Sequence, residues 1–166
     1  MMPDRKSRFA LNLHWPIAAL VLAALASGYA LTRPGAFSAG LLQAHLALGA
    51  SAGVLALARV LIWAAAGAPP PVFAARSRFE AGLAKTVHAL LRLVPLLLLA
   101  SGAGMIALSG AIGAVISGEL SDLAPFRDLP PRGLHHAAAI LLAALVGLHV
   151  IAALWHRLRA PGLRAG

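Results

Sequence analysis

Histidine is the residue type in this sequence with the widest chemical scope, and three of the seven copies, His135, His136 and His149, lie in one long apolar segment. His135 and His149 stand fourteen residues apart. In a helix, fourteen residues advance about 21 Å and complete almost four turns, so both rings leave one face, whereas His136 points elsewhere. Ionisable side chains inside a membrane-length apolar segment are costly and usually functional. The spacing predicts two stacked sites, because one metal ion cannot reach both rings.

The composition is that of a membrane protein. Of 166 residues, 60% are hydrophobic and only 11% are charged, whereas soluble domains carry about 25% charged residues. Cysteine is absent, which excludes disulfides, Fe–S clusters and thiolate zinc sites. The net charge of +9 comes from basic residues that cluster beside apolar segments. No basic-aromatic groove accompanies them, so the charge excludes nucleic-acid binding and indicates membrane orientation.

Four apolar stretches are each long enough to cross a hydrocarbon core about 30 Å thick. They cover residues 9–31, 40–66, 87–108 and 134–155. We therefore predict an all-α membrane protein, a single domain of residues 1–166 built as a four-transmembrane-helix bundle. Pro95 is expected to kink the third helix without ending it. Residues 110–118 are expected to be interfacial or re-entrant, residues 119–132 a loop, and no internal repeat is expected.

The first apolar stretch has a second interpretation. A basic segment followed by a short apolar core, with Ala24-Leu25-Ala26 as an A-x-A cleavage site, is also the pattern of a secretory signal peptide. We favour the membrane span, because a discarded leader has no use for His14 and Trp15.

The distribution of lysine and arginine predicts the topology. Nine of these residues lie in the N-terminal segment, the connection after the second span and the C-terminal segment: Arg5, Lys6, Arg8, Arg76, Arg78, Lys85, Arg157, Arg159 and Arg164. The two opposite loops hold only Arg33, Arg127 and Arg132, with three acidic residues. The positive-inside rule then places both termini in the cytoplasm.

This topology puts four histidines into two pairs. His14 and His149 fall near the cytoplasmic face, and His45 and His135 near the outer face, each pair on two different helices. A flat macrocycle held between helices needs two opposed axial ligands at one depth, as haem iron does. The facing argument favours His135 over the neighbouring His136 as the ligand.

Several nearby residues fit a cofactor but also have ordinary interpretations. Gly49, one turn from His45, would let a haem face approach the backbone, or it serves helix packing, as does Gly53. Arg59 is a candidate propionate partner or a snorkelling anchor. His88 either contacts the cofactor or is a hydrogen-bonded packing residue, whereas His156 is expected to be solvated.

The ordered set of motifs resembles the bacterial cytochrome b561 family, related to the cytochrome b subunits of hydrogenases and formate dehydrogenases. The resemblance runs from about Ser7 to Arg157. Its motifs are a basic N-terminus before Leu13-His14-Trp15, His45 followed by Gly49, Arg59 ending span two, a proline-rich connection to His88, and Gly147-Leu148-His149 fourteen residues after His135.

The resemblance implies two b-type haems between the helices, each bis-histidine ligated: His14 with His149 on the cytoplasmic side, His45 with His135 on the periplasmic side. It also implies electron transfer across the bacterial inner membrane, with the quinone pool as partner. Some relatives are thought to oxidise superoxide and reduce ubiquinone. The chain is therefore expected to be either a quinone-linked oxidoreductase of this type or an electron-transfer protein.

Two alternatives remain open at this point. One is a cytochrome b membrane-anchor subunit that serves a separate redox partner protein. The other is a non-redox helical bundle whose histidines handle a transition metal or protons.

Overall fold

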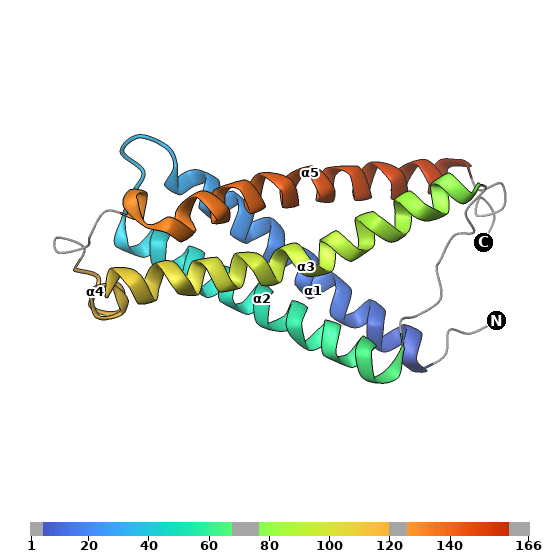
Figure 1. The fold of residues 1–166 in the computed structure, drawn as a ribbon, viewed down its shortest axis with the longest axis horizontal. Coiled ribbons are helices and arrows are strands. Elements are labelled where there is room, and N and C mark those ends of the chain that lie inside the picture. The colour runs from blue at the N-terminus through green and yellow to red at the C-terminus, as the bar shows by residue number, and fades with distance from the viewer. Residues whose placement is uncertain (1–4, 68–76, 120–125, 160–166) are drawn as a thin grey trace.

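The computed structural model describes residues 5–67, 77–119 and 126–159, and every regular element within them is helical (Figure 1). The four long helices are α1 (Arg5–Leu31), α2 (Ala39–Ala66), α3 (Arg78–Ser109) and α5 (Pro130–Arg159). Two short elements, α4 (Ile112–Ser117) and the 3₁₀ helix η1 (Phe126–Asp128), lie between α3 and α5. All four long helices are long and apolar enough to cross a membrane, which confirms the expected all-α fold with four spans.

The bundle consists of two helix pairs. α1 packs along α2, α3 packs along α5, and α2 joins the pairs by packing on α3. The buried cluster between them draws mostly on aliphatic side chains such as Ile17, Val94 and Leu142. Large apolar side chains on the outer surface, including Val54 and Ile151, are more than half exposed. An apolar exterior of this kind is suited to lipid and not to water.

α3 begins earlier than the sequence analysis expected. It starts at Arg78 and not near Val87, so part of the expected polar connection is helical. The Ser77 hydroxyl caps the helix by accepting from the Glu80 backbone N–H at 3.1 Å. The Glu80 carboxylate in the first turn also complements the helix dipole. These two local interactions extend the helix beyond its apolar segment.

α5 also begins earlier, at Pro130, so the loop expected over residues 119–132 is wrong for its last three residues. Proline suits the first turn of a helix, because the missing N–H would have no partner there. The other proline expectation holds: α3 continues through Pro95 and changes direction near its middle (Figure 1).

The short helix α4 follows directly after α3. Gly110 and Gly118 bound α4 with φ values of 63° and 80°, a left-handed conformation that favours glycine. The Gln43 side chain donates to the Val115 carbonyl and so ties α4 to α2.

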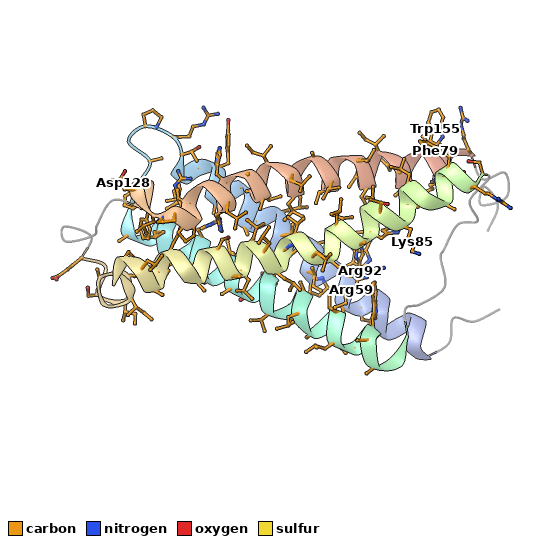
Figure 2. The ribbon with its side chains drawn as sticks, viewed as in Figure 1. Arg59, Phe79, Lys85, Arg92, Asp128 and Trp155 are labelled. Carbon is orange, nitrogen blue, oxygen red and sulfur yellow. The ribbon has the colours of Figure 1, made fainter. Side chains whose placement is uncertain are left out.

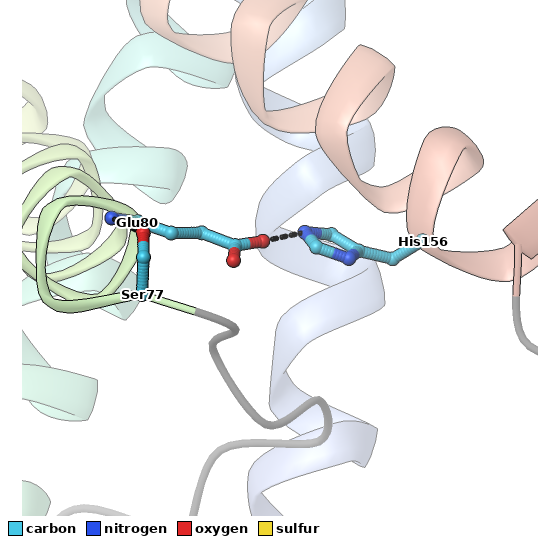
Figure 3. Close-up of polar contacts among 3 residues, drawn as sticks. All are labelled: Ser77, Glu80 and His156. Carbon is cyan, nitrogen blue, oxygen red and sulfur yellow. Dashed lines mark hydrogen bonds and ion pairs between the residues drawn. The ribbon is translucent and has the colours of Figure 1, made fainter.

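An ion pair joins α3 to α5 at the opposite end of the bundle (Figure 3). His156 Nε2 lies 3.2 Å from Glu80 Oε1, and both side chains are about 30% exposed. His156 is therefore only partly exposed to solvent, because the early start of α3 brings Glu80 alongside α5.

Candidate functional site

The first histidine pair lies between α2 and α5. The ring centres of His45 and His135 are 6.2 Å apart, and the ring planes are inclined at 80°. His136, the alternative to His135, is exposed on another side of α5. The structure therefore brings together the two residues that the depth argument paired.

Hydrogen bonding fixes the tautomer of His45. Its Nδ1 lies 3.1 Å from the Ala24 carbonyl oxygen and 3.1 Å from Ser27 Oγ. A carbonyl oxygen only accepts hydrogen bonds, so Nδ1 must carry the proton. The Nε2 lone pair of the neutral ring is then available to a ligand.

His135 has the same tautomer for a related reason. The Ser101 hydroxyl donates to the Leu97 carbonyl oxygen at 2.8 Å, which leaves its oxygen to accept from His135 Nδ1 at 2.9 Å. Both rings of this pair thus have a free Nε2. A hydrogen bond from the far ring nitrogen is the usual way in which proteins orient a metal-binding histidine.

The second set of histidines lies near the other end of the bundle, on three helices. His149 on α5 is 6.3 Å from His14 on α1 and 5.3 Å from His88 on α3, measured between ring centres. His14, the predicted partner, and His88, the possible cofactor contact, therefore both lie next to His149.

Two arginines converge on this second site (Figure 2). The guanidinium carbons of Arg59 and Arg92 lie 4.5 and 4.1 Å from the centre of the Trp63 indole. Arg59 also donates to His14 Nδ1 at 3.3 Å, while its own buried Nε has no hydrogen-bond partner. Among the described residues, neither guanidinium is paired with a carboxylate. Within the part of the chain that the structure describes, this site therefore holds two cations and no carboxylate.

The two glycines near His45 differ in their surroundings. A Cβ added at Gly53 would lie 2.8 Å from Leu99 Cβ, so this glycine permits close packing of α2 on α3. A Cβ added at Gly49 would meet nothing within 4 Å. Helix packing therefore explains Gly53 but not Gly49.

These residues suit a haem better than a bare metal ion. Two opposed metal–nitrogen bonds of about 2 Å place the nitrogens about 4 Å apart. Ring centres lie further apart than their nitrogens, so separations of 6.2 and 6.3 Å are compatible with axial ligation. The unpartnered Arg59 Nε suits a propionate carboxylate. Within the described residues, no group of three or more histidine, aspartate or glutamate side chains is arranged around one ion.

The site residues that sequence reasoning missed are Ser27 and Ser101, which orient the first pair, and Trp63, on which both arginines stack. Ser27, Ser101 and Trp63 each contact a side chain on another helix (His45, His135 and Arg92), which residue spacing within one helix does not show.

Comparison with known proteins agrees with this arrangement. A family model described as prokaryotic cytochrome b561 matches residues 5–165, nearly the whole chain. No curated protein and no solved structure gives a match. Proteins of this family are b-type cytochromes that transfer electrons in membranes, which is the role that paired histidines on membrane-spanning helices suit. The chain belongs to the prokaryotic cytochrome b561 family, and is a bacterial multi-pass membrane cytochrome that binds b-type haem.

Proposed function

We propose that this cytochrome holds two haems and moves electrons across the inner membrane, between the quinone pool and a donor or acceptor on the periplasmic side. The observation that carries the proposal is the presence of two histidine pairs with nearly equal ring separations, 6.2 and 6.3 Å. On α5 the two pairs are fourteen residues apart, about 21 Å along the helix. This spacing gives one redox site in each half of the membrane.

The axial ligands in this proposal are His45 with His135 on the outer side and His14 with His149 on the inner side. Haem supplies one-electron redox chemistry when it is bound. Histidine at both axial positions leaves no open site for oxygen or peroxide, which favours outer-sphere electron transfer. The chain contributes the spacing of the ligands, their burial and the local charge.

The inner site differs from the outer one in its hydrogen bonding. Because arginine only donates, His14 Nδ1 accepts from Arg59 and its Nε2 carries the proton. A carboxylate would draw Arg59 away and free His14 to take the tautomer already present in the outer pair. We therefore assign Arg59 as a propionate partner, with Arg92 beside it on Trp63. Gly49 leaves room for the outer haem, and His88 contacts the inner one.

The topology follows from charge. The first turns of α1 and α3 and the last turn of α5 lie at one end of the bundle and carry six of the fourteen lysines and arginines: Arg5, Lys6, Arg8, Arg78, Arg157 and Arg159. Glu119 and Asp128 lie towards the other end, where Figure 2 shows Asp128. By the positive-inside rule, the basic end is cytoplasmic, so both termini face the cytoplasm.

The partners are inferred from the family. We propose ubiquinone or a related quinone as the lipid-side partner and superoxide as one candidate donor at the outer face. An anchor subunit for a separate dehydrogenase would have the same haems without independent turnover. Purification from native membranes separates these two functions. A co-purifying dehydrogenase supports the anchor role, and full turnover by the isolated chain supports independent electron transfer to or from quinone.

An absorption spectrum of the purified protein, with iron and protein quantified together, tests the proposal. We expect a sharp reduced-minus-oxidised band of bis-histidine haem and about two haems per chain. A metal- or proton-handling bundle would show no such band. A stoichiometry of one haem would leave the cytochrome assignment intact but contradict the two-site arrangement.

Arg59→Met is expected to lower the midpoint potential of the inner haem. Removing a cation from the site stabilises the oxidised iron, which carries one more positive charge than the reduced iron. A shift of about 60 mV corresponds to a tenfold change in a one-electron equilibrium. Redox titration resolves the two haems. Lys85→Met is the matched control, because Lys85 is an exposed cation at the same end of the bundle. An unchanged inner potential in Arg59→Met would contradict the propionate assignment.

A further inference from the structure

A short sequence repeat occurs in α1 and α3, the two helices that contact the outer histidine pair. The tetrapeptide Leu-Ala-Ser-Gly occurs at residues 25–28 in α1 and again at residues 99–102 in α3. In both copies the serine hydroxyl bonds back to the carbonyl three residues earlier, Ser27 to Ala24 at 3.1 Å and Ser101 to Leu98 at 3.2 Å.

Each copy supports one imidazole from the other helix of its pair. Ser27 on α1 contacts His45 on α2, and Ser101 on α3 contacts His135 on α5, both through Nδ1. The Ala24 carbonyl, three residues before Ser27, also lies 3.1 Å from His45 Nδ1. The two helix pairs thus present a serine hydroxyl to each ring, and α1 adds a backbone carbonyl to its own.

The glycine after each serine lets the ring lie against the helix backbone. A Cβ added at Gly28 would be 2.9 Å from His45 Cε1, closer than real Cβ contacts come. A Cβ added at Gly102 would be 3.5 Å from His135 Cε1, an ordinary van der Waals contact. An alanine in the first copy would therefore have to displace the His45 ring, whereas the second copy accommodates alanine.

We propose that Ser27-Gly28 and Ser101-Gly102 are two corresponding contact sites. They orient His45 and His135 with Nε2 free and set the potential of the outer haem. The inference rests on the proposed function, in which these histidines are the outer ligands. The residues act through the rings and are positioning residues. A hydrogen bond accepted from Nδ1–H makes the ligand more basic, and a stronger donor stabilises oxidised iron.

The hydrogen-bonding part is tested with the haem-loaded, full-length double variant Ser27→Ala/Ser101→Ala. We expect unchanged haem content and an outer-haem equilibrium shifted about tenfold towards the reduced form, which is about 59 mV for one electron. The inner potential should not move. The Ser27→Thr/Ser101→Thr variant keeps both hydroxyls, and its outer haem should have the potential of the wild type. An outer potential equal to that of the wild type in the alanine variant would overturn the proposal.

The steric part is tested with the two glycines as a matched pair. Low-spin EPR of oxidised bis-imidazole haem reports the angle between the ligand planes, here 80°. Gly28→Ala should change the outer-haem signal by displacing His45, and Gly102→Ala should not. Identical signals in the wild type and Gly28→Ala would contradict the proposal that Gly28 positions the His45 ring. Wild-type protein without an outer haem would instead refute the ligand assignment itself.

Discussion

His45→Ala and His135→Ala are each expected to remove the outer haem and leave the inner one, so that haem per chain falls from about two to about one. One histidine of the pair cannot supply both axial bonds, because the opposed ring stands on the far side of the iron. The inner site should survive, because His149 lies fourteen residues, about 21 Å, further along α5. Iron and protein quantification on each purified variant measures the loss.

His136→Ala is the matched control for this pair of variants. It removes an imidazole next to His135 in the sequence, but one that is exposed and does not face His45. We expect it to retain both haems. Loss of both haems in a still-folded His45→Ala or His135→Ala protein, or loss of neither, would show that the pairing is wrong. Circular dichroism of the helices in detergent establishes folding.

The pairing of histidines could be predicted because it needs only the helical period and the order of the spans. Residues fourteen positions apart share a helix face whatever the neighbouring helices do. The alternation of spans then fixes which histidines share a depth, as His45 and His135 do. Neither step depends on how the helices are rotated about their axes.

The supporting residues could not be found in this way. A serine inside a helix usually bonds its own backbone, as Ser27 and Ser101 do. Their second contact, with a histidine, depends on the rotation of α1 against α2 and of α3 against α5. Trp63 stacks with Arg59 one turn away on α2, but its contact with Arg92 depends in the same way on how α2 meets α3.

Two of the missed features did leave a signal in the sequence. Ser77 followed three residues later by Glu80 is a capping-box pattern and marks the true start of α3. The serine of the repeated Leu-Ala-Ser-Gly stands thirteen residues after His14 in the first copy and thirteen after His88 in the second. This register makes His14 and His88 equivalent positions of the two helix pairs. It also explains why both approach His149.

His149→Ala is expected to remove the inner haem and leave the outer one, because both inner histidines converge on His149. Alanine variants of its two neighbours, His14 and His88, are expected to give different results. The His14–His149 separation of 6.3 Å matches the 6.2 Å of the outer pair, whereas His88–His149 is 5.3 Å.

His14→Ala should therefore also remove the inner haem, whereas His88→Ala should retain it with a shifted potential. Haem content and redox titration of the three variants are the measurements. His156→Ala is the control, since His156 is a further histidine on α5 that pairs with Glu80 and not with His149. If His88→Ala lost the inner haem and His14→Ala kept it, the axial ligand would come from α3. Because His14 and His88 stand at equivalent positions of the repeat and both lie next to His149, such an exchange needs no movement of α5.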